Sequence, residues 1–361
     1  MHRVLIQSAT YQECRDAVEK VFELFLLDVA GKKVLLKPNV LRAARPEEAI
    51  TTHPALLAAV IECLRERHPA TIVVGDNPGV MGYGANEECF RYSGLLDAAA
   101  GHYRNIGLDS VEVEFAAEYG GSISVSRDVL EADVVISLPK FKTHGLTVMT
   151  GAIKNSYGIL PGAQKAHFHK LAGSPEKFHE LVVEVFRLRV PDLFIMDAVL
   201  GMQGNGPAST ELRWIGRILA ADNAVALDAV VARMMGLAPE RLGFMRKAQG
   251  LGLGEYDAAC IELHGELTPI PDFKVPSLGG DAVAHARGLH TLILKSVLLR
   301  PTVDPARCTV CGACVAQCPV QALEIVDDAP RVDPTRCIVC FCCQEMCPER
   351  AITLQAPCPA A

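Results

Sequence analysis

Two cysteine runs near the C-terminus constrain what this chain can fold into more than any other feature. In each run three cysteines stand three residues apart, and a fourth follows after three intervening residues, directly before a proline. Eight thiolates at this doubled spacing are the ligand set of two [4Fe–4S] clusters, in which the fourth cysteine of each run ligates the other cluster. The predicted ligands of the first cluster are Cys308, Cys311, Cys314 and Cys347, and those of the second are Cys337, Cys340, Cys343 and Cys318.

Zinc sites and disulfide frameworks are the competing interpretations of a cysteine-rich segment. Zinc sites of this kind usually separate two C-x-x-C pairs by a long spacer, whereas three evenly spaced cysteines before Cys-Pro occur here twice. The repeat therefore favours iron–sulfur clusters. Six of the 14 cysteines lie outside the ligand set, and Cys342, next to Cys343, is interpreted as a thiol that tunes or oxidises the site rather than as an alternative ligand. Free thiols and exposed clusters predict a reducing, cytoplasmic location.

Composition limits the classes to which the chain can belong. Half of its 361 residues are apolar, which is enough for a large core and a small appended domain. The first residues lack a basic segment followed by an apolar one, so we expect no secretion signal. No apolar run approaches the roughly 20 residues that span a bilayer, so we expect no membrane span. The net charge of −7 disfavours nucleic acid as the main partner, and a homo-oligomer stays open.

Short β-branched runs alternate with amphipathic helical stretches over residues 1–265. The near-continuous apolar character of four runs is typical of buried parallel strands: Lys33–Lys37, Thr71–Asp76, Asp133–Ser137 and Leu193–Asp197. Helical periodicity is present at Ala55–Arg67, Pro175–Arg189 and Val225–Met235. The alternation predicts an α/β domain over residues 1–265, with a doubly wound, mostly parallel sheet and helices on both faces.

The rhythm of strands and helices stops after residue 265. Three prolines and a Gly-Gly pair predict a connector over residues 266–300, with a short helix at Gly288–Leu299. Residues 301–361 are predicted to form a small α+β ferredoxin-like domain around the cysteine runs.

Polar residues follow the predicted strands directly. Asn39 comes soon after the first strand, Asp76 ends the second, and the segment 139–144 follows the third. Ligands of open α/β sheets bind outside the carboxyl ends of the strands, so we expect a binding site there. The glycine-rich stretches 75–84 and 201–207 lack the order of a nucleotide-binding loop and are interpreted as tight turns.

A long stretch without carboxylates is the second informative feature. Between Asp133 and Glu176 there is no acidic residue and no arginine. The same stretch carries five lysines and three histidines: Lys140, Lys142, Lys154, Lys165, Lys170, His144, His167 and His169. A solvated face normally mixes both signs of charge. One reading is that some of these lysines are ordinary surface residues, as we expect of Lys170. The alternative, which we favour for the segment, is a pocket that neutralises a ligand bearing carboxylate or phosphate groups.

The histidines of this stretch are candidate proton donors near neutral pH. His144 stands in a glycine-rich, loop-like context. His167 and His169 alternate, so on a strand or extended loop their side chains are expected to point the same way. A histidine pair without a nearby cysteine or carboxylate is a weak metal signal, so proton donation or anion contact is the preferred interpretation.

Several motifs together resemble a known family. They include the segments 34–39, 52–54, 132–145, 150–155, 197–207 and 226–229, among them Pro-Lys-x-Lys-Thr-His and Gly-Ala-Ile-Lys-Asn. The chain is identified by them as similar to domain-of-unknown-function family 362, whose members often carry a C-terminal two-cluster ferredoxin domain. The resemblance implies that the segment 132–170 and the Asp and Asn residues at the strand ends form one site. It also implies an iron–sulfur oxidoreductase or a maturation role in anaerobic metabolism.

The sequence thus predicts an enzyme that passes low-potential electrons from two [4Fe–4S] clusters to an anionic small substrate in the α/β domain. The predicted catalytic residues are His144, Lys142, Lys154 and His167. The predicted substrate-binding residues are Lys37, Asn39, Asp76, Lys140, Thr143, Asn155 and Asn205. His144 and His167 are expected to supply protons, and the asparagines to orient polar substrate atoms.

No flavin or nicotinamide motif is apparent, so the expected electron donor is a separate ferredoxin or reductase. Two other classes of function remain open. One is a non-catalytic electron carrier whose α/β domain is a docking platform. The other is a non-redox lyase or isomerase whose clusters are structural or sense redox state.

Overall fold

Four apolar runs form the parallel centre of a mixed sheet. The structure is a computed structural model that describes residues 1–79, 84–162, 164–276 and 300–355. In it β2 pairs in parallel with β3 and β6, and β6 pairs in parallel with β9. These strands are β2 (Lys33–Pro38), β3 (Thr71–Val74), β6 (Val134–Leu138) and β9 (Leu193–Met202). Each overlaps one of the predicted runs, which confirms the predicted α/β class.

Further strands, some antiparallel and some parallel to their neighbours, extend this sheet beyond β9. The order is β11-β1-β10-β9-β6-β2-β3, with β7 pairing to β9 and β8 pairing to β7. β10 is antiparallel to both β9 and β1. The added strands are β1 (His2–Ser8), β7 (Lys140–His144), β8 (Val148–Met149), β10 (Leu212–Ala221) and β11 (Ile261–His264), and a separate hairpin consists of β4 (Ser110–Glu114) and β5 (Ser122–Ser126).

Helices cover both faces of the sheet because successive strand residues point to opposite sides. Leu35 of β2 packs into one apolar cluster with residues of α8 and α9. Its neighbours Val34 and Leu36 pack into a second cluster with residues of α1 and α2. The α/β helices are α1 (Cys14–Phe25), α2 (Pro54–Arg65), α3 (Ala85–Tyr92), α4 (Leu95–Ala98), α5 (Arg127–Leu130), α6 (Gly151–Asn155), α7 (Gln164–Ala172), α8 (Pro175–Leu188), α9 (Ala224–Met234) and α10 (Gly243–Gly250).

Local signals define where the main helices begin. Pro54 and Pro175 occupy the first turns of α2 and α8, where a missing backbone N–H costs nothing. The side chain of Asn223 accepts hydrogen bonds from two backbone N–H groups at the start of α9. These caps satisfy N–H groups that have no partner within the helix, so the observed starts lie within one residue of those predicted.

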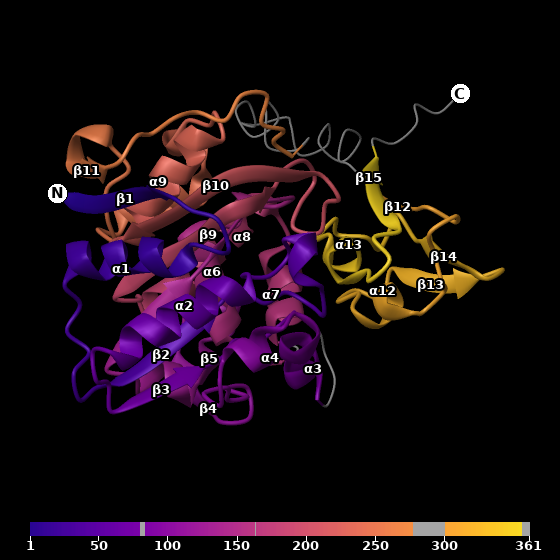
Figure 1. Cartoon of the computed structure of the whole chain (residues 1–361). Coiled ribbons are helices and arrows are strands. Elements are labelled where there is room, and N and C mark those ends of the chain that lie inside the picture. The colour runs from indigo at the N-terminus through magenta and orange to yellow at the C-terminus, as the bar shows by residue number, and fades with distance from the viewer. Residues whose placement is uncertain (80–83, 163, 277–299, 356–361) are drawn as a thin grey trace.

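The C-terminal cysteine runs lie in a small domain of two two-stranded antiparallel sheets and two short helices, beside the α/β domain (Figure 1). Its first and last strands, β12 and β15, pair with each other, and β13 pairs with β14. The elements are β12 (Arg300–Val303), α12 (Ala313–Ala316), β13 (Leu323–Val326), β14 (Ala329–Val332), α13 (Cys342–Met346) and β15 (Ile352–Gln355). The predicted helix at Gly288–Leu299 lies outside the described residues.

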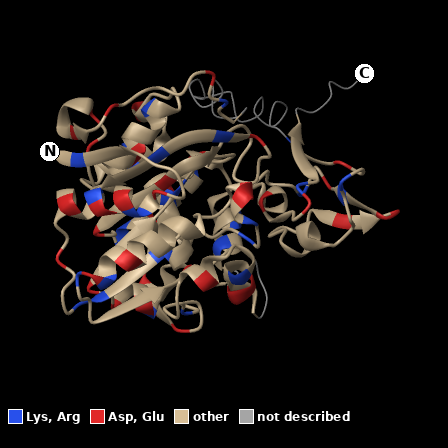
Figure 2. Ribbon diagram, in the orientation of Figure 1, with Lys and Arg blue, Asp and Glu red and all other residues tan. Residues whose placement is uncertain are grey.

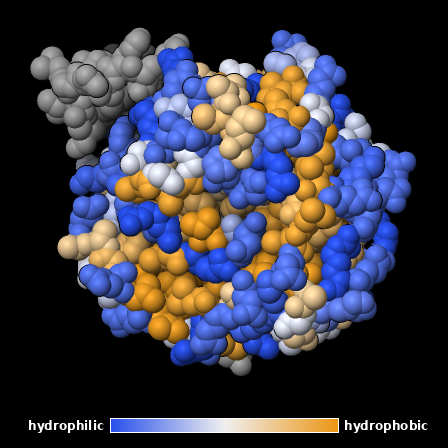
Figure 3. Space-filling model, turned by 90° about the vertical axis from the view of Figure 1, so that its left-hand side faces the viewer, coloured by the Kyte–Doolittle hydropathy of each residue, from blue (hydrophilic) through white to orange (hydrophobic). Residues whose placement is uncertain are grey.

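The surface of the α/β domain is mixed. On the face turned away from the C-terminal domain, hydrophilic residues surround several hydrophobic patches (Figure 3). Among the described residues no helix is both long enough and apolar enough to cross a membrane.

Candidate functional site

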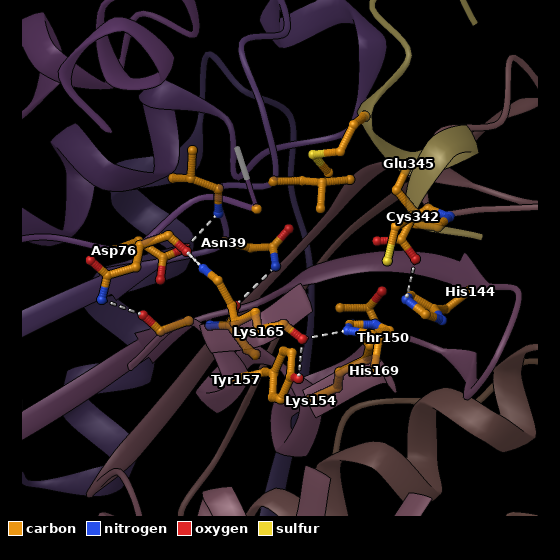
Figure 4. Close-up of a pocket in the computed structure, with 18 of the residues that line it drawn as sticks. Asn39, Asp76, His144, Thr150, Lys154, Tyr157, Lys165, His169, Cys342 and Glu345 are labelled. Atoms are coloured by element: carbon orange, nitrogen blue, oxygen red, sulfur yellow. Dashed lines mark hydrogen bonds and ion pairs between the residues drawn. The ribbon is translucent and has the colours of Figure 1, made fainter. Parts of the chain in front are cut away.

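The carboxylate-free segment folds around a pocket that lies between the two domains. β6, β7, β8, α6 and α7 come from this segment, and the pocket forms where they meet the ends of β2 and β3 and the helix α13. Figure 2 shows lysine and arginine segments, in blue, on this side of the α/β domain. The volume of the pocket is about 80 Å³. We call it the interdomain pocket; its polar lining includes Asn39, Asp76, Lys142, His144, Thr150, Lys154, Asn155, Lys165, His169, Cys342 and Glu345 (Figure 4).

A buried ion pair joins the ends of β2 and β3 beneath the pocket. The Lys37 ammonium lies 2.7 Å from the Asp76 carboxylate, and both side chains are almost fully buried. Asp76 also accepts a hydrogen bond from the backbone N–H of Val40. A side chain at Gly158 would overlap both charged groups, so the loop after α6 packs directly on the pair. Asp76 reaches the pocket, whereas Lys37 neutralises Asp76 and is not among the lining residues.

Asn39 and Asn155 form a hydrogen-bonded chain at the pocket wall. The Asn155 amide donates to Ser137 Oγ at 2.9 Å, and its carbonyl accepts from the Asn39 amide at 3.0 Å. This arrangement fixes the orientation of both amides. The side-chain oxygen of Asn39 is buried without a partner among the described residues. The structure thus brings these two predicted residues together and leaves one acceptor available.

Asp228 positions the helix that carries Lys154 and Asn155. Its carboxylate accepts the backbone N–H groups of Ala152 and Ile153 at 2.6 and 3.0 Å. The carboxylate is fully buried, and burial raises its pKa to about 7. Asp228 has no predicted role from its sequence context, because only the packing of α9 against α6 brings it to this helix start.

Three pocket lysines have no carboxylate within ion-pair distance among the described residues. Lys142 donates to the backbone carbonyl of Ile50 at 2.7 Å, and Lys165 donates to the carbonyls of Asn77 and Pro78. Lys154 lies over the rings of two aromatic residues, about 5.8 Å from the nearer centroid. Burial lowers the pKa of all three, and that of Lys165 falls to about 7. Carbonyl dipoles and aromatic faces stabilise these ammonium groups without cancelling their charge.

His144 is held as a neutral imidazole. Its Nδ1 accepts the backbone N–H groups of Leu146 and Thr147, so its proton lies on Nε2, which is 3.2 Å from Glu345 Oε1. Burial, and next the nearby charge of Lys154, lower the pKa of His144 to about 3. This corrects the expectation that His144 supplies protons, because its second nitrogen is already occupied by two donors.

His167 and His169 do not point the same way. They lie on α7 rather than on a strand, and residues two apart on a helix face different directions. His169 is buried and lines the pocket, whereas His167 is exposed. His169 Nδ1 donates to the Lys165 carbonyl at 2.7 Å. The expectation that the two side chains point the same way is therefore wrong, and the structure places His169, rather than the predicted His167, at the pocket.

Lys140 belongs to a second buried ion pair and not to the pocket. Its ammonium lies 2.7 Å from Asp197 and 3.1 Å from Tyr11 Oη, and neither Lys140 nor Asp197 is exposed. The pairing of β7 with β9 is irregular between Lys140 and Lys142. Lys140 therefore lies at this ion pair, whereas Lys142 lies at the pocket. This corrects the assignment of Lys140 to the substrate.

Two further predicted residues lie next to the pocket without lining it. Thr143 is fully buried in β7, where Gly206 packs against it so closely that a side chain at Gly206 would overlap the Thr143 carbonyl. The carbonyl of Asn205 accepts a hydrogen bond from Gln344 of α13 at 2.9 Å. Thr143 and Asn205 therefore hold the loop at Asn205 and Gly206, which meets α13 of the C-terminal domain.

The C-terminal domain supplies the carboxylate that the segment 134–175 lacks. Glu345 and Cys342, both on α13, face the pocket opposite the lysines (Figure 4). Phe341 packs into the core of the α/β domain, and a side chain at Gly145 would contact its ring at 3.0 Å. Glu345 is about 200 residues away from Lys142 along the chain, so no local pattern indicates that it belongs to the pocket.

The eight cysteines of the two runs surround two separate small cavities. The first is lined by Cys308, Cys311, Cys314 and Cys347, and the second by Cys318, Cys337, Cys340 and Cys343. These are the two predicted ligand sets, with the fourth cysteine of each run facing the other cavity. A set of four thiolates fits a [4Fe–4S] cluster. Cys342 lines both the second cavity and the interdomain pocket.

Two known proteins are similar to this chain over part of its length. A thylakoid-associated protein, sll1697 of Synechocystis sp. (strain ATCC 27184 / PCC 6803 / Kazusa), is 34% identical over 231 residues, which are 62% of this chain and 69% of that protein. A crystal structure of a protein from Thermotoga maritima is similar with a TM-score of 0.40 and 14% identity. That similarity covers 66% of this chain and 59% of the other.

Two family models match, and they confirm the resemblance drawn from the motifs. The model described as a 4Fe-4S dicluster domain matches residues 300–348, so the C-terminal domain is of an iron–sulfur, electron-transfer type. The model described as domain of unknown function (DUF362) matches residues 34–233, which is more than half of the 361 residues. The protein therefore belongs to the DUF362 family and carries a C-terminal 4Fe-4S dicluster domain.

Proposed function

We propose that this protein is an iron–sulfur oxidoreductase that passes electrons to a small anionic substrate in the interdomain pocket. One observation carries the proposal: Cys342 lines both the pocket and the second cysteine-lined cavity. Cys340 and Cys343, which stand two residues before and one residue after Cys342, belong to the proposed cluster ligands. A substrate in the pocket is therefore separated from the second cluster by little more than one residue.

The two cysteine sets are the proposed ligands of two [4Fe–4S] clusters, which supply electrons one at a time when bound. Cys311 of the first set is exposed, whereas in the second set Cys343 is buried and Cys318, Cys337 and Cys340 are only partly exposed. This difference supports entry of electrons from an external ferredoxin or reductase at the first set and their use at the second. Because the chain itself joins the clusters to the pocket, their effective concentration at a bound substrate is high.

The pocket residues have separate roles in this proposal. Lys142, Lys154 and Lys165 attract the negative groups of the substrate, since no carboxylate of the described residues pairs with them. Asn39 and Asn155 orient its polar atoms through their fixed amides. Burial of these groups strengthens their attraction for an anion, because screening by water is weak there.

The test uses the full chain, purified without oxygen and with iron and sulfide counted. Its clusters are reduced chemically, excess reductant is removed, and visible absorbance follows reoxidation after addition of single carboxylates or phosphate compounds. We expect at least one anion to reoxidise the clusters faster than buffer alone. Lys154→Met should slow that reoxidation at least tenfold while about eight irons per chain are retained.

The matched control is Lys170→Met, which removes an exposed lysine from α7 and should leave the rate unchanged. Anion binding without any effect on reoxidation would contradict electron delivery and favour a non-redox lyase or isomerase. Equal rates in Lys154→Met and in the parent protein would contradict the assignment of the pocket.

A further inference from the structure

The interdomain pocket contains more positive than negative charge. Lys142, Lys154 and Lys165 face it without an ion-pair partner among the described residues, while Lys37 and Asp76 neutralise each other. Glu345 contributes one negative charge, and His144 beside it is neutral. Three ammonium groups against one carboxylate leave an excess of two positive charges when all three are protonated, and a bound anion favours that state because it raises the lowered pKa of Lys165. A ligand with two negative charges balances this excess.

His169 and Asn39 each present the pocket with a hydrogen-bond acceptor that has no partner among the described residues. His169 Nδ1 donates to a carbonyl, so in the neutral ring Nε2 carries a lone pair; this atom is buried and has no partner among the described residues. His169 is only 8% exposed. The side-chain oxygen of Asn39 is likewise without a partner, and its orientation is fixed by Asn155. A buried acceptor needs a donor, which a fully deprotonated oxyanion cannot supply.

The size of the pocket limits the ligand further. One water needs roughly 10–15 Å³ of such volume, and the pocket has about 80 Å³. It therefore holds a ligand, or the reacting end of a ligand, of only a few heavy atoms. Charge, acceptors and volume together describe a compact ligand with several oxygen atoms.

We infer that the interdomain pocket binds a small dianion that carries one protonated oxygen. A short hydroxy-dicarboxylate and a hydrogenphosphate group share this chemistry. Its charges lie against the lysines, and its hydroxyl donates to His169 Nε2 or Asn39 Oδ1. The inference rests on the proposed function, whose substrate it narrows, but it concerns binding alone and involves no electron transfer.

The test measures binding by calorimetry at pH 8 on the oxidised, cluster-containing full chain under anaerobic conditions. Each of two pairs of dianions compares a ligand that carries a hydroxyl with one that does not. The pairs are hydroxymalonate with malonate, and hydrogenphosphate with sulfate. In at least one pair the hydroxyl-bearing member should bind about tenfold more tightly, as expected of one well-placed hydrogen bond. The pair that shows the preference distinguishes a dicarboxylate from a phosphate ligand. The monoanion glycolate should bind at least tenfold more weakly than the preferred dianion.

Two variants assign the preference to residues. His169→Phe should reduce the tenfold preference to less than threefold, and Lys165→Met should weaken both members of the preferred pair equally. Lys170→Met, on the exposed side of the same helix, should change neither quantity. Equal binding within both pairs by the parent protein would overturn the inference, and so would the absence of dianion binding with the iron content intact. The calorimetry measures binding and not electron transfer, so the inference can fail while the proposed function holds. That would be the result if an anion outside this class reoxidised the clusters.

Discussion

Removal of the Lys140 charge tests whether this lysine stabilises the fold or binds the substrate. Lys140 and Asp197 are fully buried, with 2.7 Å between the ammonium and the carboxylate. Lys140→Met keeps a long apolar side chain and removes the charge. Asp197 would keep hydrogen bonds from the His53 and Val199 N–H groups and lose its ion-pair partner.

The magnitude follows from the burial of the pair. Removing one member of a buried ion pair costs about 3–5 kcal/mol, because the other charge is left without compensation in a medium of low polarity. At roughly 2 °C per kcal/mol for a domain of this size, the thermal midpoint should fall by at least about 6 °C. Circular dichroism during heating, with urea unfolding at one temperature, measures both quantities.

An exposed pair provides the matched control. Lys32 lies 2.8 Å from Asp28, and the two side chains are 38% and 71% exposed, against 0% for Lys140 and Asp197. Lys32→Met should therefore change the free energy of unfolding by less than about 1 kcal/mol. If Lys140→Met were as stable as this control but no longer bound any dianion, the structural assignment would be refuted and Lys140 would be a ligand of the substrate.

Three further outcomes are expected. Cys343→Ser should lose about half of the bound iron, whereas Cys342→Ser, outside the proposed ligand sets, should keep it, as iron analysis checks. Asp228→Asn should lower the thermal midpoint by several degrees, because its amide nitrogen cannot accept the second N–H at the start of α6. Because burial raises the pKa of Asp228 to about 7 in the folded state, ionisation of this carboxyl lowers the free energy of unfolding. The parent protein should therefore become more stable relative to Asp228→Asn as the pH falls from about 7 towards 4. Burial lowers the pKa of Lys165 to about 7, and a bound anion should raise it again, so dianion binding at pH 7 should be accompanied by proton uptake at Lys165. Calorimetry in two buffers should detect this uptake in the parent protein and not in Lys165→Met.

The centre of the sheet was predictable because buried parallel strands have a local signature. The four β-branched runs near Val34, Ile72, Val134 and Phe194 each became a strand, and helices of the right period follow them. The antiparallel strand β10 was not predicted. Its first half is only partly buried and contains Arg213 and Arg217, and nothing in that pattern states which neighbour the strand pairs with or in which direction.

The site was predictable in composition and less so in geometry. The carboxylate-free segment correctly directed attention to Lys142, Lys154 and Asn155, which line one pocket. It did not separate Lys140 from Lys142, since a bulge in the pairing of β7 with β9 decides which residue faces the pocket. It also favoured His167 over His169, because the alternation of the two histidines suggests an extended segment, whereas both lie on the helix α7.

The sequence by itself determined the cofactor chemistry, because ligand spacing within a cysteine run is a local property that a few bonds define. The same locality made the lysine-rich segment visible. Only the tertiary structure decided that α13 closes the pocket, that Glu345 balances part of its charge, and that Cys342 separates it from the second cysteine set. These contacts join residues about 200 positions apart and depend on the packing of Phe341 into the α/β core, which no local pattern encodes.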